Sequence, residues 1–459
     1  MKSLLYMFRR YRVATLLNLL GLGVAVATFY LFMTQVIYNR TYNHNIHDYK
    51  HMYRLEIYGG LFGEDWGCNI CRPFVTLLKE IPQVKDATYI SPYINKTDVK
   101  VGNRTIAVPL IYMGKPGIEF FTGKLLSGSS KTCGDGHNVI VSRSTAEKMF
   151  GTVNAAGKTF ECENGDGSKT TVTVVGVSED MPDNCTLPNG VYICEDERGL
   201  NDWIEWSYNI YMLLDDGANP KKVERAIKLA FMKENGYSEK DEKKFDKEVN
   251  MKIRITPVDN IYFSGVGPKD RGNRGLVDVL TVASVFVLFI AMLNLLNFSL
   301  SEVPMRMRGI NTRRVMGASI GSLRMKMILE NVVFAFVGLV IGILLIVAFQ
   351  RSETCMKLVS GDIHFASHMV LAAAMAVSAL VVGALSAMIP AFYSTSFAPA
   401  MVLKGSFGLS PRGRRLRMAI MAVQFCVAFA LAIYTGVMSN QSSYIFNSDY
   451  GFNKNEVFY

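Results

Sequence analysis

Residues 13–37 read VATLLNLLGLGVAVATFYLFMTQVI, a run of 25 residues that contains no Asp, Glu, Lys or Arg. A helix of about 20 apolar residues is long enough to cross the hydrocarbon core of a bilayer. Four further apolar stretches follow, at Val277–Leu300, Val332–Phe349, Val370–Tyr393 and Met418–Met438. The only charged residue among them is Asp278, the second residue of its stretch. The sequence therefore predicts a membrane protein with five transmembrane helices.

Basic residues near these stretches predict the orientation of the chain. They lie before the first stretch (Lys2, Arg9, Arg10, Arg12), after the second (Arg306, Arg308, Arg313, Arg314, Arg324, Lys326) and after the fourth (Lys404, Arg412, Arg414, Arg415, Arg417). Because short loops rich in Lys and Arg stay in the cytoplasm, we expect a cytoplasmic N-terminus and place residues 40–275 outside. We attribute much of the net charge of +10 to the basic residues that set the membrane orientation and attract anionic lipid. We therefore expect no nucleic-acid partner.

The segment between the first two stretches is long enough for a sizeable folded domain. Its alternating runs predict strands at Thr105–Met113, Asn138–Ser142 and Thr171–Val177. Other patterns predict helices at Phe74–Glu80, Arg143–Phe150 and Asn219–Glu234. The predicted fold is therefore an α-helical membrane protein with a large extracytoplasmic α+β domain inserted between the first and second transmembrane helices.

Six of the eight cysteines fall in this outer segment, where disulfides can form. Cys68 and Cys71 form a CxxC pair, and Cys185 and Cys194 flank a Pro-Asn-Gly turn, so these four are candidate disulfide residues. Their pairing cannot be deduced from the sequence, and unreacted thiols remain an alternative. The sequence contains no second CxxC to complete a zinc site with this pair. His47 and His51 are spaced as a possible metal pair on one helix face, but no suitable third ligand lies near them, so we expect no metal.

No motif predicts catalysis by this chain. Residues 151–159 resemble a nucleotide-binding loop, but Gly151 and Gly157 are one residue too far apart for GxxxxGK[ST]. The spans also lack an ionisable residue near the predicted midplane, which disfavours an ion-coupled carrier.

Small residues recur at four-residue spacing in the third and fourth stretches, where they allow helices to approach closely. They are Gly338 and Gly342, then Ala379 and Gly383. Asn294 and Asn297 share one face of the second span, which favours interhelical hydrogen bonds over a pore lining.

The basic loop 301–330 is the segment of the sequence that indicates function most specifically. Pro304 is expected to end the preceding helix, and residues 309–319, GINTRRVMGAS, predict a short amphipathic helix at the cytoplasmic surface. Such a helix could lie on lipid or dock on a soluble partner.

Four segments, in this order, resemble permeases of the MacB/FtsX type from ABC transporters. They are Tyr42–Glu56, residues 174–182 (VVGVSEDMP), residues 313–319 (RRVMGAS), and residues 389–393 with 399–405 (IPAFY and PAMVLKG). The resemblance implies that a separate cytoplasmic ATPase, which binds ATP and Mg, acts on this chain, and that the chain itself holds no cofactor. It implies ATPase-coupling roles for Arg306, Arg308, Arg313, Arg314, Met316 and Gly317.

The resemblance also implies a domain order: a cytoplasmic stub with the first span (1–39), a MacB-like core domain (40–275), an FtsX-like permease domain (276–405), and a linker with a fifth span (406–459). The fifth span resembles the start of a second half, so a second permease half or a homodimer is an expected partner, along with an unknown periplasmic substrate. We expect the protein in the bacterial inner membrane. Two alternatives remain: a membrane-anchored periplasmic sensor without an ATPase, and a thiol-disulfide enzyme built on Cys68 and Cys71.

Overall fold

The computed structural model describes residues 12–59, 62–134, 136–163, 169–195, 200–267, 270, 272–397 and 411–448. Contacts divide the chain into two compact units. Ile37–Val277 forms the first, which we call the inserted unit, and the chain on either side of it forms the second, the helical unit.

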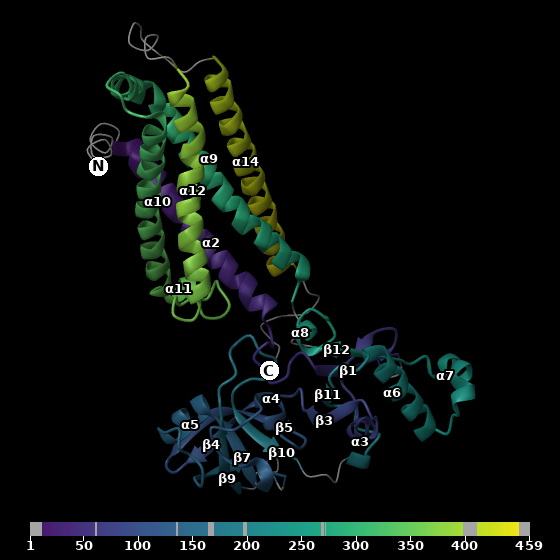
Figure 1. Cartoon of the computed structure of the whole chain (residues 1–459). Coiled ribbons are helices and arrows are strands. Elements are labelled where there is room, and N and C mark those ends of the chain that lie inside the picture. The colour runs from purple at the N-terminus through teal and green to yellow at the C-terminus, as the bar shows by residue number, and fades with distance from the viewer. Residues whose placement is uncertain are drawn as a thin grey trace. The chain divides into compact units, whose positions relative to one another are not determined.

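The helical unit contains long helices (Figure 1). They are α2 (Arg12–Arg40), α9 (Arg274–Val315), α10 (Ile320–Gln350), α12 (Met369–Thr395) and α14 (Pro411–Asn447), with the short α11 (Glu353–Met356) after α10. Five helices in the described residues are long and apolar enough to cross a membrane, and each contains one of the apolar stretches of the sequence. α10 and α12 pack along each other.

The prediction that Pro304 ends a helix is wrong. α9 continues through Pro304 to Val315, so residues 309–315 are the end of a 42-residue helix and not a separate short helix. Proline removes one backbone hydrogen bond and costs about 3 kcal/mol inside a helix. Val303 and Met307, on either side of the proline, are buried against neighbouring side chains, and this packing offsets the cost.

The inserted unit is built on a sheet that contains twelve strands within the described residues. The strands are β1 (Met52–Tyr58), β2 (Trp66–Gly67), β3 (Val84–Ile90), β4 (Lys96–Val101), β5 (Arg104–Met113), β6 (Ser127–Gly128), β7 (Asn138–Ser142), β8 (Thr159–Glu163), β9 (Lys169–Ser178), β10 (Val191–Cys194), β11 (Asn209–Leu214) and β12 (Lys252–Pro257). The helices are α3 (Pro73–Lys79), α4 (Glu119–Thr122), α5 (Arg143–Phe150), α6 (Pro220–Glu234), α7 (Glu242–Val249) and α8 (Val258–Ile261), with 3₁₀ turns η2 (Ser130–Thr132) and η4 (Glu239–Asp241).

Six of these strands close into a barrel. β4 pairs with β5 and β8, β9 pairs with β8 and β7, and β10 pairs with β7 and β5, which completes the ring. Successive residues of a strand point to opposite faces. Val139 and Val141 of β7 therefore lie in the core inside this barrel lobe, whereas Ile140 belongs to a second core on its outer face. Closure leaves these strands without free edges.

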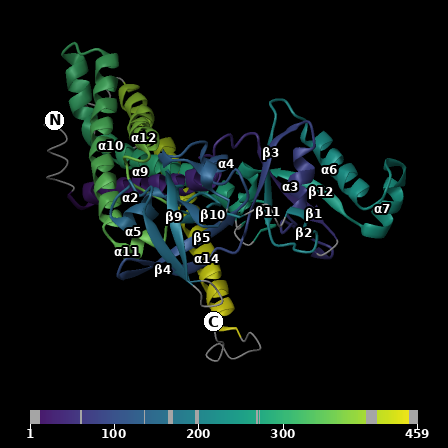
Figure 2. The ribbon, with the colours of Figure 1, turned by 90° about the horizontal axis from the view of Figure 1, so that it is seen from below.

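Strands β3, β11, β1 and β12 form a sheet lobe in that order, with β2 paired to β1 and with α3, α6 and α7 beside it (Figure 2). The short strand β6 pairs with β9 of the barrel. Its core contains Leu78, Met212, Ile227 and Phe245, all almost fully buried. Asn219 caps α6 by accepting from the amide of Lys221, and Pro220 occupies the first turn. The strands and helices predicted in the outer segment are confirmed, with α5 and β7 matching at both ends.

Candidate coupling site

An ion cluster joins the ends of α9 and α10. Arg306 of α9 contacts Glu302 on its own helix (Nη2–Oε2 3.0 Å) and Glu330 on α10 (Nη1–Oε2 2.7 Å). Both carboxylate side chains are only 10% exposed. Removing one partner from a buried ion pair leaves an uncompensated charge, which is strongly destabilising. The cluster therefore fixes α9 against α10.

Two arginines bind the same region to the end of α12. Arg314 donates from Nη1 to the backbone oxygens of Thr395 (3.1 Å) and Phe397 (2.7 Å). Arg324 donates from Nε to the Thr395 hydroxyl (2.9 Å), and its guanidinium lies 4.0 Å from the ring centroid of Phe392. Cations are favourable at a helix C-terminus, where the last carbonyls lack partners.

Between the ends of α9 and α10 lies a groove with a cavity of about 250 Å³. Besides the three residues of the ion cluster, it is lined by Met305, Gly309, Ile310, Arg313, Leu323, Lys326 and Met327. The groove therefore combines apolar walls with charges of both signs.

The turn that joins α9 to α10 exposes apolar side chains. Val315 is 65% exposed and Met316 is 81% exposed. Gly317 adopts a left-handed conformation (φ +95°), which glycine tolerates without strain, and Ser319 then caps α10 by accepting from the amide of Ser322. An apolar tip of this kind is typical of a surface that meets a partner.

The structure separates the six residues for which the resemblance implies ATPase coupling into two sets. Arg308, Arg313, Met316 and Gly317 are exposed at the end of the hairpin. Arg306 and Arg314 instead bind within the helical unit. Glu302, Glu330 and Arg324 also contribute contacts here, although the sequence pattern gave none of them a role at this site. A signal for the two carboxylates existed, because each lies two residues from an apolar stretch in an otherwise basic loop.

The small residues singled out in the sequence lie at helix contacts. A Cβ atom on Gly338 would lie 2.6 Å from Leu22 of α2, and one on Gly342 would lie 3.0 Å from the backbone oxygen of Gly23. Ala379 is fully buried in α12. A Cβ atom on Gly383 would lie 2.5 Å from that of Ala335, on α10. These contacts allow α2, α10 and α12 to approach closely.

Asn294 and Asn297 of α9 face different helices. Asn294 lies against Gly21 of α2, since a Cβ atom there would be 3.6 Å from its Nδ2. Asn297 donates from Nδ2 to Gln424 Oε1 of α14 (3.1 Å). The second contact is an interhelical hydrogen bond.

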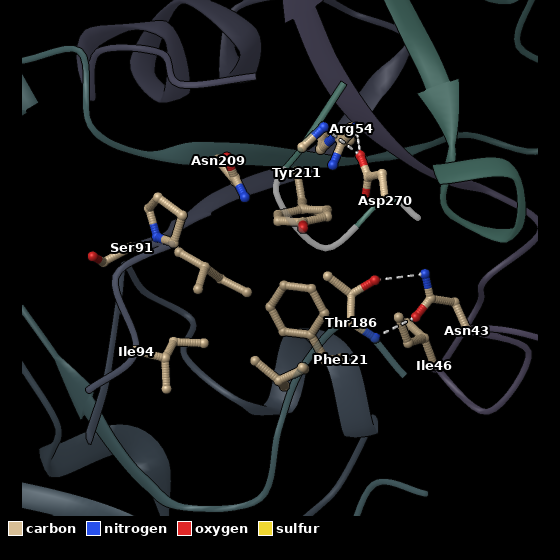
Figure 3. Close-up of a pocket in the computed structure, with 14 residues that line it drawn as sticks. Asn43, Ile46, Arg54, Ser91, Ile94, Phe121, Thr186, Asn209, Tyr211 and Asp270 are labelled. Atoms are coloured by element: carbon tan, nitrogen blue, oxygen red, sulfur yellow. Dashed lines mark hydrogen bonds and ion pairs between the residues drawn. The ribbon is translucent and has the colours of Figure 1, made fainter. Parts of the chain in front are cut away.

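In the inserted unit, the residues that follow α2 bind those that precede α9. The rings of Tyr42 and Tyr262 stack with centroids 4.1 Å apart, and Asn43 donates to the backbone oxygen of Val258 (2.8 Å). Asn43 also exchanges two hydrogen bonds with Thr186, at 2.9 and 2.7 Å (Figure 3). Thr186 lies in the loop before β10 of the barrel lobe. One junction therefore holds both chain connections and a loop of the barrel lobe.

A buried charge cluster lies beside this junction. Arg54 of β1 contacts Glu56 (2.6 Å) and Asp270 (2.7 Å), and all three side chains are 3% exposed or less. Arg254 also contacts Glu56, at 2.6 Å. Burial alone would lower the pKa of Arg54, but the Asp270 carboxylate beside it holds this pKa above its ordinary value, so the guanidinium stays charged. Asp270 lies four residues before α9, so this cluster anchors the segment that enters it.

The junction and the charge cluster border a small cavity of about 40 Å³, shown in Figure 3. Phe121, Ile94 and Tyr211 line it together with Asn209. Asn209 Oδ1 and Arg54 Nε are buried and have no hydrogen-bond partner among the described residues. A cavity of this size has room for a few waters, which polar groups of this kind can hold.

All eight cysteines lie in described residues, and in the structure none forms a disulfide. Burial raises the pKa of Cys68 to about 11 and that of Cys71 to about 12. Thiols with such pKa values stay protonated near neutral pH and are poor nucleophiles, which disfavours a thiol-disulfide enzyme at this pair. Cys194 forms a hydrogen bond with Cys133.

Comparisons with known proteins agree with this architecture. The family described as MacB-like periplasmic core domain matches residues 15–230, and the FtsX-like permease C-terminal family matches residues 281–399. No curated protein matches the chain significantly.

Solved structures similar to the chain include a domain of a permease, a periplasmic region and an extracellular domain. A domain described as part of a permease protein from Porphyromonas gingivalis is 21% identical, with a TM-score of 0.38, and the match covers 49% of this chain and 95% of that one. The periplasmic region of MacB from Actinobacillus actinomycetemcomitans is 16% identical (TM-score 0.31, 46% and 90% covered). The extracellular domain of the ABC-type transporter YknZ from Gram-positive bacteria is 14% identical (TM-score 0.29, 45% and 99% covered).

The two family matches follow each other along the chain in the order expected of a permease with a periplasmic domain, and the apolar helices described above fit them. The chain belongs to the MacB/FtsX-type permeases, the membrane components of ABC transporters.

Proposed function

We propose that this chain is the permease subunit of an ABC transporter in which a separate cytoplasmic ATPase binds the α9–α10 turn. ATP, with Mg, is bound and hydrolysed in that partner. The resulting movement of the helices changes the position or shape of the periplasmic domain, which acts on a substrate or protein in the periplasm by export or by mechanotransmission. FtsX- and MacB-like permeases work with cytoplasmic ABC ATPases, which supports the proposal.

The observation that carries the proposal is the exposed turn at Val315 and Met316. It is apolar at its tip, with Arg308 and Arg313 exposed nearby on α9. Two side chains, Arg314 and Arg324, tie it to the end of α12, and a third, Arg306, ties α9 to α10. A force applied to this turn would therefore reach three helices together.

The junction in the inserted unit supports the second half of the proposal. Asn43, Tyr262 and Asp270 hold the residues after α2 and those before α9 within one bonded cluster. Because α2 and α9 flank the inserted unit in the chain, a shift of either helix would pull directly on the contacts of this cluster. The bonds of Asn43 to Thr186 would pass the displacement to the barrel lobe.

We propose an inner-membrane location with the N-terminus in the cytoplasm and residues 40–275 in the periplasm. The basic residues on the α9–α10 hairpin support this orientation, because they lie at the end expected in the cytoplasm. A homodimer or a second permease half would complete the membrane part of the transporter.

The proposal is tested by co-purification. We expect an Arg313→Glu, Met316→Glu double variant, made in the full chain and purified from its native host, to lose its ABC ATPase at least tenfold. Both side chains are exposed, so the variant should fold, while it adds negative charge and removes the apolar tip. The readout is the amount of ATPase, recognised by peptides of its GxxxxGK[ST] loop, per amount of permease.

The matched control is Leu358→Glu, which changes a 77% exposed apolar residue in the loop after α10, on the opposite side of the proposed membrane. It should leave the ATPase bound. Equal recovery of the ATPase with both variants and the unchanged chain would refute docking at this turn.

A further inference from the structure

Two cysteines of the inserted unit lie together in its core. Cys133 follows η2, and Cys194 is the last residue of β10, so about 60 residues separate them in the sequence. Cys133 is 4% exposed and Cys194 is 1% exposed, and both belong to the core on the outer face of the barrel lobe. The fold therefore brings together two thiols that no sequence motif connects.

The contacts of the pair direct the two thiols toward each other. They share a hydrogen bond. The sulfur of Cys194 rests on Gly117, where an added Cβ atom would lie only 2.7 Å away. Gly117 has a φ of +79°, a conformation that favours glycine. Because glycine has no Cβ atom, this position leaves room for the Cys194 sulfur. Two buried thiols within hydrogen-bond distance of each other are candidates for a disulfide bond.

We propose that Cys133 and Cys194 form a disulfide bond as the periplasmic domain folds. The reaction converts two thiols into one S–S bond and releases two protons and two electrons. The electrons reduce the disulfide of a periplasmic thiol oxidase, through a mixed disulfide that the second thiol then resolves. The proposal needs only the periplasmic placement of the domain, and not the ATPase coupling proposed above.

The other outer cysteines are placed differently. Cys71 lies in the core of the sheet lobe, and Cys162 lies inside the barrel lobe. Cys185 shares the core of the pair and is a competitor for Cys194, because the sequence alone allowed these two to pair.

Burial sets when the bond can form and how it behaves. The hydrogen bond with Cys133 and burial raise the pKa of Cys194, so this thiol does not ionise in the folded domain. The oxidase must therefore act before the barrel lobe closes. Once formed, the bond is inaccessible, and reductants should break it only after unfolding.

The experiment uses the full chain isolated from its native membrane. Thiols are blocked with N-ethylmaleimide in denaturant without reductant, the protein is then reduced, and released thiols are labelled with iodoacetamide. We expect Cys133 and Cys194 to carry the second label, and a peptide that links them to appear before reduction. Recovery of both with the first label, or of a peptide that links Cys194 to Cys185, would overturn the proposal.

Variants give an independent readout. A bond lost from either end is lost completely, so Cys133→Ala, Cys194→Ala and the double variant should all lower the thermal midpoint by the same roughly 10 °C. Cys162→Ala changes a matched buried cysteine. It should lower the thermal midpoint by a smaller amount, and this decrease should add to that of each of the three variants. Losses that add between Cys133→Ala and Cys194→Ala would indicate two independent thiols and contradict the bond.

Discussion

At Arg54, one guanidinium contacts two carboxylates in the interior of the periplasmic domain. The segment that contains it, Met52–Glu56, resembles the start of the family's core domain, but the sequence shows neither its burial nor its partner Asp270, more than 200 residues away. The physical reason is that a buried charge is tolerated only with its partners, and these are brought together by the complete fold.

Replacing Arg54 with Met should lower the free energy of unfolding by about 3–5 kcal/mol, because it leaves Asp270 and Glu56 buried with fewer partners. The measurement is thermal or denaturant unfolding of the full chain in detergent. Arg143→Met is the control, since Arg143 pairs with Glu147 on an exposed helix face at 3.4 Å and should cost about 0.5 kcal/mol or less. Similar losses in the two variants would show that the Arg54 cluster adds no stability.

At the scale of helices and strands, the sequence predicts well what depends on local pattern. The apolar stretches predict the long helices. Alternation predicts β7, and helical patterning predicts α5, at their observed ends. The same local reasoning fails at Pro304, because buried neighbours of α9 outweigh a local preference for a break. The small residues of α10 and α12 can be found by spacing, but the helix that each one faces becomes known only from the structure.

Gly383→Ala should destabilise the helical unit by about 1–3 kcal/mol, because the new methyl group would lie 2.5 Å from Ala335 and 3.0 Å from the backbone oxygen of Asn331. Neither neighbour can move aside as a flexible side chain would. Gly436→Ala on α14 is the matched control, since nothing lies within 4 Å of its added methyl group. The thermal midpoint in detergent should fall for the first variant only; equal midpoints would refute close packing of α10 and α12.

For the whole molecule, composition and the distribution of basic residues predict the class, the number of spans and the position of the large domain. They do not predict the closure of six strands into a barrel, which depends on pairing of β5 with β10 far along the chain. The family resemblance implies a coupling role for Arg314, and the structure shows that its guanidinium also binds the end of α12. A basic residue in a loop looks the same in the sequence whether it contacts a partner protein or a neighbouring helix of its own chain. Its contacts in the structure are needed to distinguish the two roles.

Photo-crosslinking from position 316 in intact cells shows directly whether the ABC ATPase docks on the α9–α10 turn. A photoreactive amino acid in place of Met316 should join the permease covalently to its ABC ATPase, whereas the same group at Leu358 should give no such product. A product from position 358 and none from position 316 would place the ATPase at the other end of the helices and refute docking at the α9–α10 turn.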